Sequence, residues 1–107
     1  MSEYYDSHYA NMTVQPITLM QRMVSRDMFN GFLFCTAIKY HLRAGNKQGE
    51  SYEKDIVKRD RYFAWLYNAD VLGAVIDPSL DYELPVKYKE MYIRNIDFYR
   101  KLKEPIR

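Results

Sequence analysis

Three basic side chains stand close together in the middle of the chain, at spacings that suit a phosphate group. Lys39 and Arg43 lie four residues apart in an apolar segment with helical periodicity, and Lys47 follows between two glycines. At 100° per residue, Phe32 and Thr36 fall on the same stripe as the first two cations, to within about 60°. Because arginine binds phosphate through paired donors and lysine as a point charge, we predict a phosphate cradle. The alternative is a solvated cationic helix end, stabilised by the helix dipole.

A second polar stripe lies on the next helical segment. Asp55, Lys58 and Tyr62 occupy positions i, i+3 and i+7 and therefore share one face to within about 60°. If the two segments pack as antiparallel helices, Asp55 meets Lys39 or Arg43 across the hairpin. Such an ion pair would fix the register of the hairpin. The alternative is an acid that orients the basic side chains or accepts a hydrogen bond from a ligand hydroxyl.

Four helices are expected to position these stripes. Pro16 suits the first turn of a helix that reaches about residue 24. Ser25 suits the cap of a second helix, over 26–44, which ends at Gly45. A third helix begins at residue 50 or 51 and ends between 68 and 72; a fourth spans 86–103. The predicted fold is therefore all-α, a small bundle of about four helices built on a central antiparallel helical hairpin.

The chain divides into three parts at its composition breaks. Residues 1–15 are polar and aromatic without a helical period and are predicted to form an extended N-terminal arm. Residues 16–72 form the helical hairpin domain. Residues 73–107 supply a connecting loop, which Gly73, Pro78 and Pro85 interrupt, and the C-terminal helix. Within that loop, residues 74–76 have the composition of a short strand.

Composition excludes several classes of protein. The 107 residues suit one domain, with 48% hydrophobic and 28% charged residues and a net charge of +2, which argues against a strongly basic nucleic-acid coat. The single cysteine excludes a disulfide scaffold and a four-cysteine metal site. No His, Cys and carboxylate spacing predicts a metal site of another kind. Cys35 lies in an apolar segment and is predicted to be a core residue, and Asp60 is predicted to be solvated.

The aromatic content predicts self-association. The chain has 11 Tyr, 5 Phe, 1 Trp and 6 Met, and a domain of this size buries a low fraction of its own surface. We therefore expect a homo-oligomer. No secretion signal and no stretch long enough to cross a membrane are visible, so the protein is expected in a reducing cytoplasm, without a membrane partner. Tyrosines at helical spacing are typical of a core or an interface, which makes nucleic acid an unfavoured partner.

Two runs of residues resemble a known family: FNGFLFCTAIKYHLRAGNK over 29–47 and YEKDIVKRDRY over 52–62. They resemble the SaV-like phage protein family, whose pattern is roughly F-x-x-G-N-x-x-K-Y-x-x-R-x-G-x-K followed by D-x-x-K-x-x-x-Y. Within it they look most like the C-terminal part of the early nucleotide kinases of T-odd podophages. The resemblance covers about residues 8–68. The chain departs from it at Cys35 and Thr36, where the family has Gly-Asn, and at Asn46, where it has Lys.

The resemblance implies a phage early protein that binds phosphorylated nucleotides and transfers a phosphoryl group to deoxynucleoside monophosphates. ATP would be the co-substrate, and no further cofactor is implied. The chain has no P-loop motif, as in that kinase branch. Carried over by residue, the catalytic group is Lys39, Arg43 and Asp55, and the nucleotide-binding group is Thr36, Tyr40, Gly45, Lys47, Lys58 and Tyr62.

Three classes of function stay open at this point. The first is the nucleoside monophosphate kinase without a P-loop. The second is a non-enzymatic interaction protein that binds a host factor, as an inhibitor or as the trigger of a host defence system; a branch of the family is known through such a system. The third is a structural or nucleic-acid-associated early protein. The aromatic and methionine content and the C-terminal helix, which the resemblance does not cover, both favour the second class.

Overall fold

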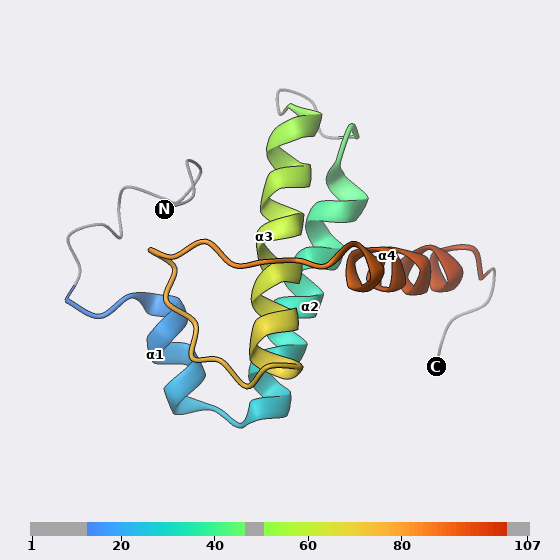
Figure 1. Ribbon diagram of the computed structural model, residues 1–107. Coiled ribbons are helices and arrows are strands. Elements are labelled where there is room, and N and C mark those ends of the chain that lie inside the picture. The colour runs from blue at the N-terminus through green and yellow to red at the C-terminus, as the bar shows by residue number, and fades with distance from the viewer. Residues whose placement is uncertain (1–12, 47–50, 103–107) are drawn as a thin grey trace.

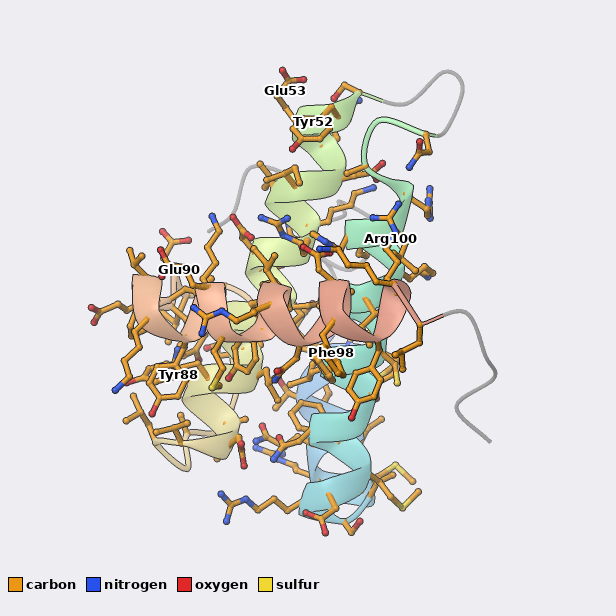
Figure 2. The ribbon with its side chains drawn as sticks, turned by 90° about the vertical axis from the view of Figure 1, so that its right-hand side faces the viewer. Tyr52, Glu53, Tyr88, Glu90, Phe98 and Arg100 are labelled. Atoms are coloured by element: carbon orange, nitrogen blue, oxygen red, sulfur yellow. The ribbon has the colours of Figure 1, made fainter. Side chains whose placement is uncertain are left out.

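The computed structural model describes residues 13–46 and 51–102, and within these ranges it contains four α-helices and no strand (Figure 1). Figures 1 and 2 show α2 and α3 antiparallel and side by side, with α4 crossing this hairpin transversely. The predicted all-α bundle on a central hairpin is thereby confirmed. The helices are α1 (Pro16–Met23), α2 (Arg26–Arg43), α3 (Tyr52–Asp70) and α4 (Val86–Arg100). Of the arm predicted for 1–15, residues 1–12 lie outside the described ranges.

Local signals set the ends of the central helices. The Ser25 hydroxyl oxygen accepts a hydrogen bond from the N–H of Met28 at 3.2 Å at the start of α2, as predicted. The Ser51 oxygen does the same for the N–H of Lys54 at 3.0 Å at the start of α3. Beyond α2, Gly45 takes φ +77°, a left-handed conformation that favours glycine. These caps hold the two polar stripes on helices of defined length.

The cap of α3 gives a first prediction. We expect Ser51→Ala to lower the free energy of unfolding by about 1 kcal/mol, because the substitution removes the acceptor for an N–H of the first turn. Ser51→Asp keeps an acceptor and adds a negative charge at the helix N-terminus, so it should keep the stability of the unaltered protein. Urea denaturation measures both. An equal loss in the two variants would show that the cap does not matter.

The core lies in the seam between α2 and α3 and extends to α1, to residues 71–85 and to α4. Phe29, Leu33 and Ala37 follow one another at four-residue spacing along the inner face of α2. From the other side, Phe63 of α3 stacks on Tyr92 of α4, with ring centroids 5.1 Å apart and an interplanar angle of 29°. Burial also raises the pKa of Tyr92 to about 12, so its phenol stays protonated near neutral pH. The buried hydrophobic residues are Ile17, Phe29, Leu33, Ala37, Phe63, Ala64, Trp65, Leu66, Ala69, Ile76, Tyr92 and Ile96.

Cys35 is not part of this core, and the prediction that it would be is wrong. Its side chain is exposed. Two residues along an α-helix turn the side chain by about 200°, so Cys35 points away from the seam that Leu33 and Ala37 fill. The run around it is apolar on more than one face, because Phe32 on the outer side is also largely exposed.

The connection over 71–85 is held to α1 by side chains instead of by a strand partner. Gln21 Nε2 donates to the carbonyl of Ala74 at 3.0 Å, and Gln21 Oε1 accepts from the N–H of Ile76 at 2.7 Å. Thr18 Oγ1 donates to the carbonyl of Ile76 at 2.8 Å. These bonds satisfy the backbone groups that a strand would have paired. The short strand suggested for 74–76 is therefore wrong.

A chain of polar contacts fastens α4 to the hairpin. Asp97 Oδ1 lies 3.1 Å from His41 Nε2, and His41 Nδ1 lies 2.9 Å from Arg59 Nη1. Arg59 Nε then donates to Asp60 Oδ1 at 2.9 Å, and Lys89 Nζ donates to Asp60 Oδ2 at 2.9 Å. Because arginine only donates, His41 Nδ1 accepts, and its Nε2–H donates to Asp97. Asp60 is thus half-buried and paired on both oxygens, which corrects the prediction that it is solvated.

Candidate functional site

Three cations gather around the ring of Tyr40. Lys39 Nζ lies 5.3 Å from the ring centroid, Arg43 Cζ 5.5 Å and Lys58 Nζ 5.5 Å. Two of these side chains come from α2 and the third crosses from α3. Arg43 lies three residues after Tyr40 and shares its face of α2, and Lys39 directly precedes Tyr40 in the sequence. We call these four residues the Tyr40 cluster.

The Tyr40 cluster rests on a row of aromatic rings. Tyr62 of α3 stacks on Tyr40 with centroids 6.0 Å apart and an interplanar angle of 27°. Phe32 approaches the edge of Tyr62 at 6.3 Å, and Trp65 approaches it at 5.0 Å. Trp65 is buried and fixes the row to the core. The ring that the cations contact is therefore packed, through Tyr62 and Trp65, against the core of the hairpin.

The charges of the Tyr40 cluster favour an anionic ligand. Within residues 13–46 and 51–102, no carboxylate forms an ion pair with Lys39, Arg43 or Lys58. Each cation gains about 0.5–2 kcal/mol from the ring face. Because all three lie near the same ring centroid, they are also close enough to repel one another. An anion bound between the three cations would attract each of them and so offset their mutual repulsion. A phosphate group, with several charged oxygens, suits three donors best.

Three other predicted residues have different roles or cannot be placed. The Thr36 hydroxyl donates to the carbonyl of Phe32 at 2.8 Å, so its proton is used within α2. Gly45 makes the turn after α2, where a Cβ would lie 3.3 Å from the ring of Tyr52. Lys47 lies outside the described residues.

Asp55 is the most unusual of the predicted residues. It is 1% exposed, and neither carboxylate oxygen has a hydrogen-bond partner. The ion pair with Lys39 or Arg43 that the sequence suggested is not formed among the described residues. Packing rotates α3 so that Asp55 faces inward with Arg59 and Phe63, whereas Lys39 stays exposed on α2. The structure thus buries an acid that no described residue pairs.

Neighbouring residues of the hairpin face two different flanks. Tyr40 and Lys58 belong to the Tyr40 cluster, whereas His41 and Arg59, one residue further along each helix, belong to the polar chain under α4. A step of one residue turns a helical side chain by about 100°, which separates the two sets. The sequence did not indicate the polar chain, because its members come from three helices and carry no local motif.

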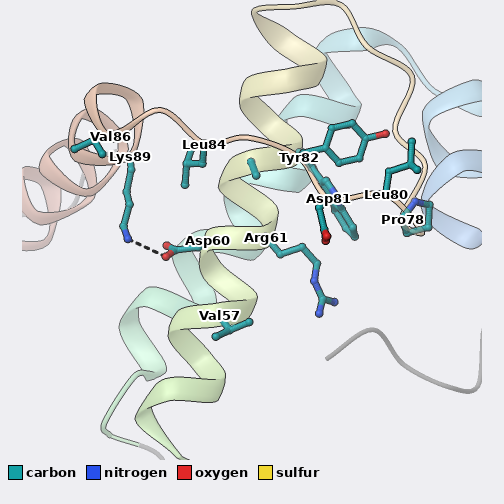
Figure 3. A pocket seen from close by; sticks show the side chains of 12 residues that line it. Val57, Asp60, Arg61, Pro78, Leu80, Asp81, Tyr82, Leu84, Val86 and Lys89 are labelled. Carbon is teal, nitrogen blue, oxygen red and sulfur yellow. Dashed lines mark hydrogen bonds and ion pairs between the residues drawn. The ribbon is translucent and has the colours of Figure 1, made fainter. Parts of the chain in front are cut away.

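A cavity of about 390 Å³ lies between α3 and the connection over 71–85. Figure 3 shows Lys89 reaching Asp60 on one side of it and Pro78 and Leu80 on the other. Trp65 forms part of its wall, and the Arg61 guanidinium lies 5.9 Å from the Trp65 ring. Through the contact of Trp65 with Tyr62, this cavity adjoins the aromatic row beneath the Tyr40 cluster.

The part of the chain that the structure describes has neither a metal-binding group nor a membrane-spanning helix. No group of three His, Cys, Asp or Glu side chains there could hold a metal ion. None of the described helices is both long and apolar enough to cross a bilayer.

Comparison with known proteins identifies the family. Residues 4–64 match the family described as "Protein of unknown function (DUF3310)", and the chain belongs to that family. It is also 38% identical over 58 residues to nucleotide kinase gp1.7 of Escherichia phage T7, a match that covers 52% of this chain and 30% of that kinase. The chain thus spans about a third of the length of the curated relative it matches. No solved structure matches the chain.

These comparisons confirm the resemblance seen in the sequence and mark it as that of a phage-type protein. The family match includes every residue of the Tyr40 cluster as well as Asp55. It ends before the connection over 71–85 and α4. Among the described residues, the match therefore covers α1, α2 and the larger part of α3, and the polar chain ties this part to a helix outside the match.

Proposed function

We propose that the chain binds phosphorylated nucleotides on the Tyr40 cluster and acts as a deoxynucleoside monophosphate kinase without a P-loop. The observation that carries this proposal is the set of three cations around one tyrosine ring, none of them paired with a carboxylate of the described chain. The partial match to a phage nucleotide kinase supports the same reading. As a phage-type protein, it would do this in the cytoplasm of the host cell.

Phosphoryl transfer mainly requires that reactants be positioned and negative charge be neutralised. In this proposal Lys39, Arg43 and Lys58 bind the oxygens of the phosphates, and Arg43 supplies the paired donors that suit them. Tyr40 and Tyr62 present ring edges and phenol groups to the nucleoside. Lys47, from the turn after α2, is assigned to the same phosphates on the sequence pattern alone. ATP is the phosphoryl donor, and no other cofactor is assigned.

A turnover assay tests the kinase. Purified protein is incubated with ATP and each deoxynucleoside monophosphate in turn, and the diphosphate product is measured. We expect product with at least one nucleotide and a loss of about 10- to 100-fold in Lys58→Ala, which removes the cation from α3 without removing a buried contact. A contaminating host kinase would give equal rates for both proteins. The absence of product and of nucleotide binding would reject the proposal.

One observation favours the interaction protein as the second candidate. The corner between α1 and α2 exposes a methionine-rich apolar surface, with Met23 at 73% and Met28 at 63% exposure. Such surfaces adapt to protein partners. A host factor bound there would leave the Tyr40 cluster free, so the two candidates do not exclude each other.

Self-association is proposed on a different surface. An apolar groove of about 540 Å³ lies between α2 and α4, bordered by Phe34, Ile38, Leu42 and Tyr99. Phe98 is 60% exposed near the same end of α4 (Figure 2). A second copy covering this groove would bury that surface, and sedimentation velocity at micromolar concentration would show a dimer or larger species. A clean monomer would contradict the proposal.

A further inference from the structure

Asp55 combines deep burial with the lack of a hydrogen-bond partner among residues 13–46 and 51–102. Its side chain is 1% exposed, and both carboxylate oxygens are without a hydrogen bond. A buried carboxylate left unpaired costs several kcal/mol. Hydrogen-bond donors from outside the described chain would remove this cost by binding the Asp55 carboxylate.

Its position puts it beside the Tyr40 cluster. Asp55 and Lys58 are three residues apart on α3, which places their Cβ atoms about 5–6 Å from each other. Gly45 lies against Tyr52 at the beginning of α3, so the following turn, with Asp55, is level with the end of α2, where Arg43 stands. The Lys58 ammonium contacts the Tyr40 ring, and no carboxylate of the described chain holds it. Because Asp55 is 1% exposed, a ligand reaches it only if a neighbouring side chain such as Lys58 moves towards the phosphate.

The chemistry of the two groups is complementary. Cations attract the phosphates of a nucleotide, whereas a carboxylate repels them and accepts hydrogen bonds only. The nucleoside part of the same molecule carries such donors, either sugar hydroxyls or base N–H groups. Inorganic phosphates have no sugar hydroxyl or base N–H, and their charge is repelled by the carboxylate.

We propose that Asp55 binds the donor groups of the nucleoside and so makes the site select a nucleotide over a simple phosphate. This inference rests on the proposed function of the Tyr40 cluster. Asp55 then acts as a specificity-determining residue: the cations hold the charged end of the ligand, and Asp55 reads the uncharged end. Both of its oxygens are available, so a ligand with two adjacent donors would satisfy it fully.

The test compares two probes on two proteins. Binding of a nucleoside monophosphate and of inorganic pyrophosphate is measured by calorimetry with the unaltered chain and with Asp55→Asn. The amide keeps the shape of the side chain but loses the charge and turns one acceptor into a donor. We expect nucleotide binding to weaken about 10- to 100-fold and pyrophosphate binding to stay equal or to tighten. Equal changes for both probes would overturn the inference, with the proposed function intact.

A second arm needs no variant and identifies the donors. The unaltered protein is titrated with a nucleoside monophosphate that lacks both sugar hydroxyls and with one whose base N–H is methylated. Weaker binding of either analogue supports the inference and names the sugar or the base as the source. Undiminished binding of both would overturn it. If neither the nucleotide nor pyrophosphate binds the unaltered chain, the proposed function itself has failed, and the inference fails with it.

Discussion

Replacing Arg43 by alanine is expected to weaken the binding of a nucleoside monophosphate about 10- to 100-fold. Arg43 lies 5.5 Å from the Tyr40 ring centroid and is the one guanidinium of the Tyr40 cluster, so its loss removes the paired donors that suit phosphate. It forms no ion pair with a carboxylate of the described chain, and its removal therefore strands no partner. Helical circular dichroism should stay unchanged, while calorimetry reports the affinity.

Two matched variants sharpen this experiment. Arg94→Ala removes an exposed arginine of α4, which lies outside the cluster, so it changes the net charge equally and should leave affinity nearly unaltered. Arg43→Lys keeps the charge without the planar fork and should give an intermediate affinity. If Arg43→Ala binds nucleotide as tightly as Arg94→Ala does, Arg43 is not part of the site.

The second large effect is on stability. We expect Arg59→Ala to lower the free energy of unfolding by roughly 2–4 kcal/mol, because it leaves Asp60 and His41 without their central donor. The Arg59 side chain is 7% exposed, and that of Asp60 is 29% exposed. Partial hydration of Asp60 keeps the expected value below that for a fully buried pair. Urea denaturation followed by circular dichroism measures it.

Lys89→Met provides the control at the other end of the same chain. Its ammonium also bonds Asp60, at 2.9 Å, but its side chain is 36% exposed, so its loss should cost less than about 1 kcal/mol. A cost for Arg59→Ala that is no larger than that for Lys89→Met would show that Arg59 does not hold the polar chain together.

Local chemistry allowed much of the fold to be predicted from the sequence. Ser25 and Gly45 mark the ends of α2 through hydrogen-bonding and conformational preferences that act over one turn. The buried face of Phe29, Leu33 and Ala37 has the same helical period, but it was not predicted. An antiparallel hairpin was enough to bring Lys58 towards the cations of α2, because the two helices are joined by a short connection.

Rotation of a helix about its own axis could not be predicted in the same way. The stripe of Asp55, Lys58 and Tyr62 is real, but packing turns it so that Asp55 faces the seam while Lys58 reaches the Tyr40 ring. The spacing alone left Asp55 free to meet Lys39. Tertiary packing decides such rotations, and it also places Cys35 at the surface.

The polar chain under α4 could not be predicted from the sequence for another reason. His41, Asp60 and Asp97 are far apart along the chain and have ordinary helical neighbours. Only the crossing of α4 over the hairpin brings them together through Arg59. Interactions of this kind depend on the arrangement of three helices, which no local pattern records.

The central claim is that phosphorylated nucleotides bind the Tyr40 cluster, and amide chemical shifts measured by NMR test it most directly. A nucleoside monophosphate is titrated into labelled protein, and the perturbed amides are mapped onto the helices. We predict that the largest perturbations fall on residues 39–43 of α2 and 55–62 of α3. Perturbations confined to the cavity beneath the connection over 71–85, or no perturbation at saturating nucleotide, would contradict the account.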